Sequence, residues 1–229
     1  MPHCWLMDMV RLMNWKPAAR AVLDRLNHPL ATYRLSRYLR DHKPPYRVQV
    51  GSGTVSRPGW LNTDVGWRAR YWLDIGKPLP FPDHSVAAIF SEHVVEHVPP
   101  ATVAYFLGEA FRVLVPGGII RILTPDAEAH AREYIARSAQ AHALLERHAK
   151  LGRYSRRPVD ILNLTFLAHV HVYIWDEESL GDALCAVGFQ QVRRYRVGES
   201  ADPELADMDG HFKPGDPAIE FTLVLEATK

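Results

Sequence analysis

The 229-residue sequence contains only two cysteines, Cys4 and Cys185, and they lie far apart in the chain. Neither a disulfide framework nor a Cys-x-x-Cys metal site can be built from them, which favours a reducing, cytoplasmic environment. An excess of one charge is also missing, because 27 Lys and Arg oppose 26 Asp and Glu and give a formal net charge of +1. The overall charge therefore gives no reason to expect a nucleic-acid partner.

Long uninterrupted apolar runs are absent as well. The N-terminal segment is apolar in places, but Asp8, Arg11, Asn14 and Lys16 interrupt it before a signal-peptide core or a membrane span could form. We therefore expect no stable insertion into a membrane. With 47% hydrophobic and 23% charged residues, the composition is that of an ordinary globular protein that can bury one large core.

Residues 1–45 are predicted to be a helical extension. Apolar residues recur near helical spacing from Ala18 to about Arg40, and Pro29 predicts a break between two helices. Basic residues outnumber acidic ones here, which could suit an anionic surface, although a solvated helix face explains the same pattern.

From residue 46 to residue 229, predicted strands and helices alternate. The predicted strands are 46–50, 60–64, 71–73, 86–90, 119–123, 189–197 and 219–227, and the predicted helices are 101–114, 127–150 and 177–187. This alternation predicts an α/β, Rossmann-like, doubly wound sheet of seven strands. The loop 198–217 is too poor in helix for a parallel crossover, so six strands should be parallel and the last antiparallel. Residues 127–175, irregular from 153, are interpreted as a lid or substrate-binding insertion.

Polar groups gather where the predicted strands end. Gly51-Ser52-Gly53 follows the first strand and removes side chains where a ligand must approach the backbone. Asp64 ends the next strand, where its carboxylate can accept both hydroxyls of a ribose. Taken singly, the glycines are explained by a tight turn and Asp64 by a strand-end cap. Taken together, the glycine turn and Asp64 favour a nucleoside site. Ser56 replaces the third glycine of a dinucleotide fingerprint, so a ligand without a pyrophosphate fits better.

The segments VGSG, PGWLNTD, LDIGKPLPFPDHSVAAIFSEHVVEHV and EAFRVLVPGGIIRILTPD follow one another between Tyr46 and Asp126. In this order they resemble the class I S-adenosylmethionine-dependent methyltransferases, in particular the short methyltransferase type 11-like proteins. The resemblance continues more loosely through HVYIWDEESLGDALCAVGFQQV to the last strand. It implies a Rossmann-like fold, S-adenosylmethionine as the cofactor, and methyl transfer to an acceptor.

The resemblance also implies which residues bind the cofactor, all of them after strand ends: Gly51, Ser52, Gly53, Asp64, Asp74, Ile75, Ser91, Glu92 and His93. The glycine turn would line the methionine moiety and the ribose, and Asp64 would hold the ribose hydroxyls. Asp74 and Ile75 would flank the adenine, and the segment 91–93 would lie beside the sulfonium. Gln49 stands where an acid often precedes the glycine turn, and the first helix is shortened.

Histidines are the candidate catalytic residues. Methyl transfer is an in-line displacement that depends mainly on alignment, but a hydroxyl or amine acceptor must also lose a proton. His93, His169 and His171 are candidates for the base, although structural roles explain His169 and His171 about as well. His93 and His97 are spaced i,i+4, so on a helix they would share a face and could ligate a metal with His169 or His171. HVVEH lacks the zincin order and no third ligand is specified, so we predict no metal site. For His97 we expect packing or a helix hydrogen bond.

The sequence therefore predicts a cytoplasmic S-adenosylmethionine-dependent methyltransferase that acts on a small molecule or a sugar or glycan. We expect a monomer or homodimer without a nucleic-acid partner. The alternative is a non-catalytic binding or scaffold module that retains a methyltransferase fold, because Gln49 and the short first helix depart from the commoner motif. A nicotinamide-dependent oxidoreductase is disfavoured by Ser56 and by the short spacing from glycine to acid.

Overall fold

The computed structural model describes residues 4–150, 156–167, 170–206, 208–209, 212–213 and 215–229, with side chains from Ala21 onward. The strands are β1 (Tyr46–Val50), β2 (Leu61–Asp64), β3 (Tyr71–Trp72), β4 (Val86–Glu92), β5 (Leu114–Pro125), β6 (Gln190–Tyr195) and β7 (Thr222–Thr228). The α-helices are α1 (Cys4–Asp41), α2 (Pro100–Val113), α3 (Ala127–Ala136), α4 (Ala139–Lys150), α5 (Asp160–Leu167), α6 (Glu177–Val187) and α7 (Pro203–Ala206). Two 3-10 turns are η1 (Val95–His97) and η2 (Pro217–Phe221).

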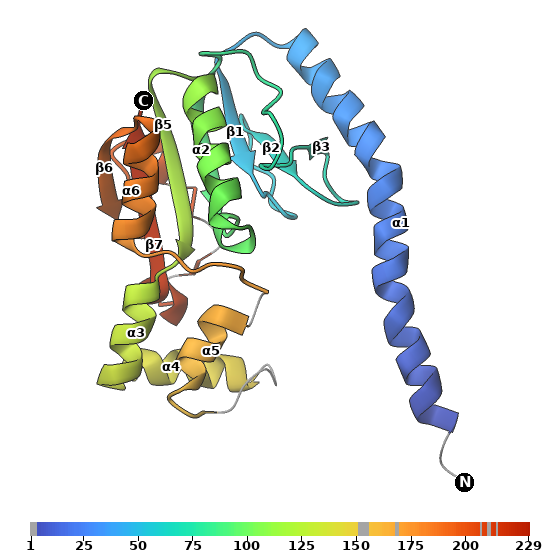
Figure 1. The fold of residues 1–229 in the computed structure, drawn as a ribbon, viewed down its shortest axis with the longest axis vertical. Helices are drawn as coiled ribbons and strands as arrows, with labels where there is room; N and C mark the ends of the chain where they lie inside the picture. Colours follow the sequence, from blue (N-terminus) through green and yellow to red (C-terminus); the bar gives the residue numbers. More distant parts are fainter. Residues whose placement is uncertain (1–3, 151–155, 168–169, 207, 210–211, 214) are drawn as a thin grey trace.

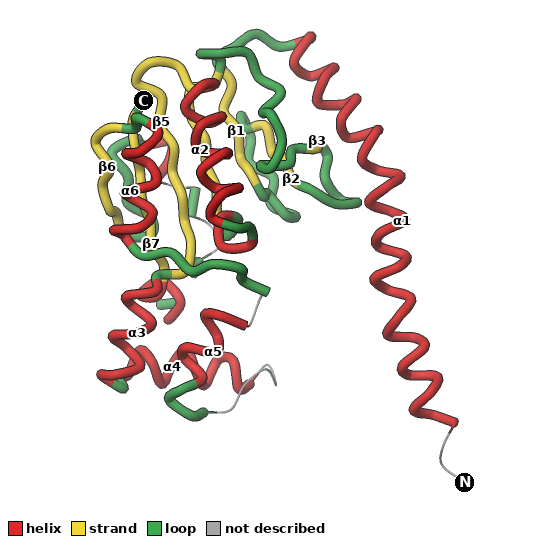
Figure 2. The backbone as a smooth tube through the Cα atoms, in the orientation of Figure 1, coloured by secondary structure: helices red, strands yellow, loops and turns green. Residues whose placement is uncertain are grey.

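The strands form one seven-stranded sheet in the order β3-β2-β1-β4-β5-β7-β6 (Figures 1 and 2). Only β7 runs antiparallel to its two neighbours, so the predicted sheet of six parallel strands and an antiparallel last strand is confirmed. Val50 of β1 pairs with Thr63 of β2 and with Ser91 of β4. The carboxyl ends of these three strands therefore meet at one edge, where open α/β sheets bind their ligands.

Helices α2 and α6 cover one face of the sheet, as Figure 1 shows. Their apolar residues join strand residues such as Val48, Ile89 and Ile120 in the main core. Helix α6 begins with a capping box at Asp176 and ends at Gly188, as predicted, with φ at 112°. Strand β5 starts directly after α2, so the Pro116-Gly117-Gly118 segment lies within the strand and not before it.

A second core lies on the opposite face of the sheet, and no helix follows β1 there in the part of the chain that the structure describes. Phe90, Leu123 and Val224 pack there against Leu205 and Met208. Residues 51–60 form turns, which agrees with the shortened first helix expected from the sequence. The lack of that helix leaves this face to be covered by loops.

A buried ion network holds one of these loops in place. Arg121 is fully buried, and its guanidinium pairs with Asp209 and, at 2.5 Å, with Glu226. The same group donates to the carbonyl of Glu199 at 2.9 Å. Because a buried charge without partners costs several kcal/mol, this network fixes the position of the segment that carries Asp209.

The N-terminal extension contains one helix and not two. Helix α1 continues through Pro29, although proline in a helix interior costs about 3 kcal/mol. Contacts on both sides of Pro29 offset this cost, because Asn27 donates to the Gly66 and Ala69 carbonyls at 3.0 and 2.9 Å and Leu35 is buried. The rest of α1 extends away from the sheet (Figure 1). No helix among the described residues is long and apolar enough to span a bilayer.

Three helices, α3, α4 and α5, lie in the insertion predicted at 127–175. They gather beyond the end of β5 in Figure 1 and form a separate small core with Phe221 of η2. The expectation of irregular structure from 153 to 175 is wrong for α5. Ile161 and Leu164, one turn apart, are buried against this core, and such tertiary burial decides the conformation of a short segment.

Candidate functional site

The Gly51-Ser52-Gly53 turn follows β1 at the carboxyl edge of the sheet. Both glycines have positive φ, at +70° and +56°. A Cβ on Gly51 would lie 2.2 Å from Val94 Cγ2, so only glycine lets the chain after β4 pack against the turn. A Cβ on Gly53 would meet no described atom within 4 Å. Gly53 therefore borders space through which a ligand could approach the backbone.

Asp64 lies beside this turn, as the register of β1 and β2 requires. Its Oδ2 accepts a hydrogen bond from the Gly53 amide at 2.6 Å, and its Oδ1 accepts one from the Val65 amide at 2.6 Å. The carboxylate therefore orders the glycine turn. Since a carboxylate can accept about four hydrogen bonds, ordering the turn and binding ribose hydroxyls are compatible roles.

Asp74 and Ile75 follow β3 and lie on the α1 side of the molecule. Asp74 accepts from the Gly76 amide at 2.9 Å and lines a cavity of about 630 Å³ with His28 and Trp72. Asp64 does not line this cavity. Ile75 is buried in the main core. The adenine contacts expected of Asp74 and Ile75 stay predictions.

Ser91 and Glu92 end β4 next to the glycine turn. Among the described residues, neither Ser91 Oγ nor Glu92 Oε1 has a hydrogen-bond partner, and both atoms are buried. Burial raises the pKa of Glu92 above its ordinary value, although the charges of His93 and Arg57 oppose this. A buried polar atom without a partner costs about 1–3 kcal/mol. These atoms therefore leave hydrogen-bonding capacity at this edge that a water or a polar ligand could use, although Glu92 also pairs with Arg57 at 3.9 Å.

His93 and Glu96 form a coupled pair. His93 Nδ1 lies 2.8 Å from Glu96 Oε1, and Thr124 Oγ1 donates to Glu96 Oε2 at 3.1 Å. Burial lowers the pKa of His93, but the hydrogen bond and charge of Glu96 outweigh it and leave that pKa raised. Burial likewise raises the pKa of Glu96, but His93 reverses the effect and leaves it lowered. The fully buried Glu96 is therefore a carboxylate at neutral pH.

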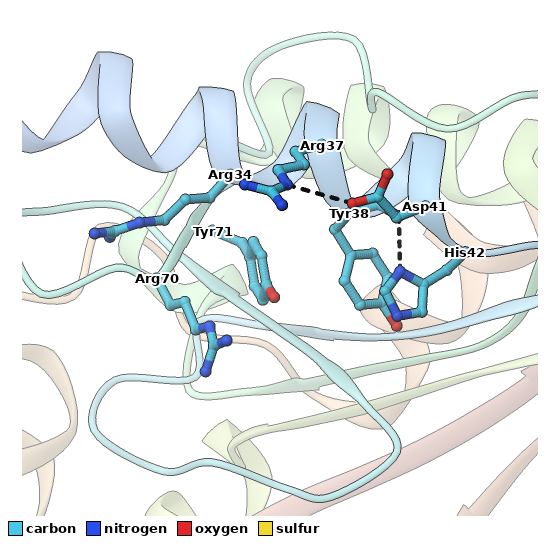
Figure 3. Close-up of a pocket in the computed structure, with 7 residues that line it drawn as sticks. All are labelled: Arg34, Arg37, Tyr38, Asp41, His42, Arg70 and Tyr71. Carbon is cyan, nitrogen blue, oxygen red and sulfur yellow. Dashed lines mark hydrogen bonds and ion pairs between the residues drawn. The ribbon is translucent and has the colours of Figure 1, made fainter.

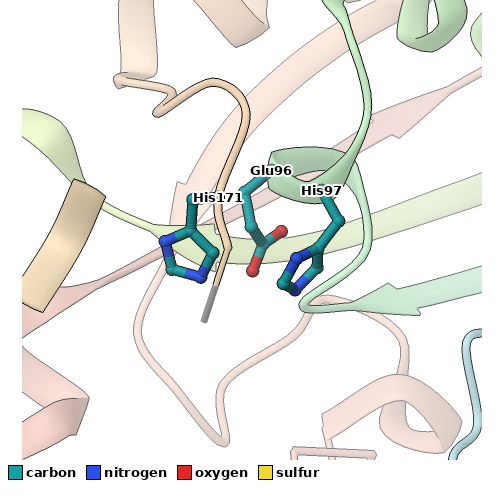
Figure 4. Close-up of side chains that lie close together, drawn as sticks. All are labelled: Glu96, His97 and His171. Carbon is teal, nitrogen blue, oxygen red and sulfur yellow. The ribbon is translucent and has the colours of Figure 1, made fainter. Parts of the chain in front are cut away.

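His97 and His171 lie on either side of the Glu96 carboxylate (Figure 4). His171 Nδ1 bonds the Thr165 carbonyl, so Nδ1 carries the proton and the lone pair is on Nε2. Burial lowers the pKa of His171, which is neutral at pH 7. Its ring centroid lies 5.0 Å from that of His97. One possible donor atom each from Glu96, His97 and His171 lies within 4.8 Å of the other two.

The expectation that His93 and His97 share a helix face is wrong. His93 has a φ of 53°, and the η1 turn spans only three residues, so no helix connects the two side chains. His97 is exposed, and its ring packs edge-on against that of His171, so it is not buried against a helix as expected. His169 lies outside the described residues. Trp175 is buried in the main core.

A cavity of about 100 Å³ lies between the strand ends and the helices of the insertion. Its lining residues are His93, Pro125, His130, Leu144, His148, Leu164, Thr165, His171, Phe212, Ala218, Phe221 and Thr222. His130 Nδ1 bonds the Asp126 carbonyl at 2.7 Å, and burial lowers the pKa of His130 to about 4. The sequence analysis missed His130 and His148, because no local pattern tells which faces of α3 and α4 turn inward.

A third cavity, which is cationic and of about 530 Å³, lies where the end of α1 meets β3 (Figure 3). The exposed side chains of Arg34, Arg37 and Arg70 surround it, and Arg37 pairs with Asp41 at 3.4 Å. Arg34 and Arg37 belong to the extension, so this cavity accounts for part of its basic pattern. Arg70 also lines a neighbouring cavity together with Ser52 and Gly53 of the glycine turn.

A family model of the methyltransferase domain matches residues 62–122 and confirms the resemblance over that segment. Similar solved structures include a SAM-dependent methyltransferase from Archaeoglobus fulgidus, with a TM-score of 0.47, 16% identity, and coverage of 88% of this chain and 94% of that chain. A possible histamine N-methyltransferase from Thermotoga maritima has a TM-score of 0.44, 15% identity, and coverage of 96% and 97%.

Human N-acetylserotonin methyltransferase, solved in complex with SAM, has a TM-score of 0.46 and 14% identity. The match covers 81% of this chain and 48% of that chain. No curated protein sequence matches significantly.

Proposed function

We propose that this chain, whose residues 62–122 match the methyltransferase domain, is an S-adenosylmethionine-dependent methyltransferase. The main support is the convergence of three features at one edge of the sheet. These features are the open side of Gly53, the carboxylate of Asp64, and the partnerless buried oxygens of Ser91 and Glu92.

The donor set at this edge fits the cofactor. Asp64 would accept the ribose hydroxyls, and the oxygens of Ser91 and Glu92 would bind the methionine end. The bound cofactor supplies an electrophilic methyl group on a sulfonium. A carboxylate whose pKa is raised by burial, such as Glu92, gains its charged form when a cationic group binds beside it.

The small cavity beside His93 is the proposed acceptor site. Its volume of about 100 Å³ holds only a few waters at about 30 Å³ each, so it takes the reacting end of an acceptor, or α4 and α5 must open. Leu144, Leu164 and Phe221 exclude water from this space, and the histidines face polar groups. We therefore propose that the insertion at 127–175 is a lid and that the acceptor is a hydroxyl- or amine-bearing small molecule or glycan.

His93 is the proposed base. Its Nδ1 is engaged by Glu96, so Nε2 would take the acceptor proton while the buried carboxylate stabilises the resulting imidazolium. With its proton removed, the acceptor oxygen or nitrogen would attack the methyl carbon that the cofactor would supply, and the carbon–sulfur bond electrons would stay on sulfur. His171 and His169 are the further candidates. The balanced charge and scarce cysteines support action in the cytoplasm, as a monomer or homodimer.

Isothermal titration with S-adenosylhomocysteine tests the proposal. Binding is expected, whereas NADH should give no heat. Absence of S-adenosylhomocysteine binding at millimolar ligand would overturn the proposal that this chain is a methyltransferase. Binding without turnover of labelled cofactor by any acceptor would instead favour a binding or scaffold module.

A further inference from the structure

We propose that Glu96, His97 and His171 bind one divalent transition-metal ion beside the acceptor cavity. Figure 4 shows the Glu96 carboxylate between the two imidazoles. Their possible donor atoms lie within 4.8 Å of one another, and His171 also lines the cavity. This proposal departs from the sequence prediction of no metal, which considered His93 and His97 on a helix that does not form, together with His169 or His171.

Backbone contacts hold the three residues together independently of any ion. Glu96 and His97 are consecutive in η1, and the Glu96 carbonyl accepts from the Val172 and Tyr173 amides at 2.7 and 3.2 Å. The chain that carries His171 is thereby tied to η1. Tetrahedral zinc holds its ligand atoms about 3.3 Å apart. The exposed His97 side chain can rotate to close the remaining distance.

Surrounding hydrogen bonds orient the ligands as metal sites require. The Thr165 carbonyl holds His171 Nδ1, which leaves the lone pair on Nε2, and outer partners of this kind orient metal-bound histidines. His93 and Thr124 each bond one oxygen of Glu96 and fix the plane of its carboxylate. Glu96 is fully buried, and a buried carboxylate is stabilised by a neighbouring cation.

The donor set selects the class of metal. Two imidazoles and one carboxylate suit Zn²⁺, Co²⁺, Ni²⁺ or Fe²⁺, whereas Mg²⁺ and Ca²⁺ prefer oxygen ligands. Three protein ligands leave a position open for an outside oxygen. A metal there would lower the pKa of an acceptor hydroxyl. Metal binding does not depend on the proposed function, whereas this catalytic role rests on it.

The test is titration of the tag-free, chelator-treated full chain with Co²⁺, followed by its visible absorption and by competition with Zn²⁺. We expect one equivalent to bind with a tetrahedral-type spectrum that Zn²⁺ abolishes and Mg²⁺ does not. His97→Ala changes an exposed side chain and should fold, and it should weaken binding at least about tenfold, as should His171→Ala. His142→Ala, an exposed histidine of α4 outside the cluster, should bind as the unchanged chain does.

The proposal is overturned if Co²⁺ gives no such spectrum, or if His97→Ala and His142→Ala bind with equal affinity. Titration with S-adenosylhomocysteine separates the two proposals. Cobalt binding without S-adenosylhomocysteine binding would support the metal-site proposal and refute the methyltransferase proposal. S-adenosylhomocysteine binding without cobalt binding would refute the metal-site proposal alone.

Discussion

Gly51 and Gly53 share a positive φ but differ in what surrounds them. Replacement of either by alanine strains the backbone by about 1–2 kcal/mol. Gly51→Ala also drives a Cβ into Val94, so its free energy of unfolding should fall by about 1–3 kcal/mol more than that of Gly53→Ala. Urea denaturation measures both losses. Val94→Ala should recover part of the Gly51→Ala loss, and equal losses for the two glycines would contradict the contact.

Asp64 is expected both to order the glycine turn and to bind the cofactor ribose. Asp64→Ala leaves the Gly53 amide without its acceptor and removes the proposed ribose contact, so S-adenosylhomocysteine should bind about 1–3 kcal/mol more weakly. Isothermal titration gives the affinity. Asp41→Ala, which removes an exposed acid at the end of α1, is the control and should bind normally. Unchanged affinity of Asp64→Ala would refute the placement of the ribose.

His130 should make the stability depend on pH. Its pKa is about 4 in the folded chain and about 6.5 when unfolded, so below pH 6.5 the unfolded chain binds the extra proton and the free energy of unfolding falls. Between pH 7 and pH 5 the loss due to His130 should be about 2 kcal/mol. Urea denaturation at both pH values should show a smaller difference for His130→Gln, which can still donate to Asp126. An identical pH dependence would show that burial does not depress this pKa.

At the scale of elements, the buried network of Arg121 holds α7 and the residues after it on the face of the sheet opposite α2 and α6. Asp209→Asn leaves the Arg121 charge only partly paired, and breaking a buried pair costs about 3–5 kcal/mol. Glu204→Gln, which breaks the exposed pair with Arg47 in the same region, should cost less than about 1 kcal/mol. Chemical denaturation compares the two. Similar small losses would mean that Asp209 does not fix the loop.

The insertion illustrates how an element can depend on its neighbours. Helix α5 has eight residues, which is too short for an isolated helix to be stable in water. Burial of Ile161 and Leu164 with α4 and Phe221 supplies the stabilisation. The same packing brings Thr165 and His171 to the strand ends, so the proposed acceptor cavity exists only when the insertion is folded.

At the scale of the whole molecule, the end of α1 completes the core beside β3. Deletion of residues 1–42 removes Leu35 and Tyr38 from the core, so the free energy of unfolding should fall by about 3–5 kcal/mol. For a chain of this length, Tm should drop by about 2–4 °C per kcal/mol. A chain that starts at Ala21 keeps Asn27 and Leu35 and should lose less. Thermal unfolding followed by circular dichroism makes the comparison, and equal Tm values for the two truncations would contradict this role.

The sequence by itself determined the sheet and one half of the site. Strand periodicity and a helix-poor last loop specify six parallel strands and an antiparallel one, because these signals are local. Once the strands are parallel, the glycine turn, Asp64 and Ser91 must meet at one edge. The sequence could therefore predict which residues meet at this edge, whereas the cofactor contacts assigned to them, and to Asp74 and Ile75, stay predictions.

Only the tertiary structure decided the rest. Pro29 does not break α1, because contacts with the β2–β3 loop outweigh a local penalty. His130, His148 and the cluster of Glu96, His97 and His171 come together through the folding of the insertion over the strand ends. Contacts between segments far apart in the chain depend on which faces are buried, and no spacing within either segment encodes that.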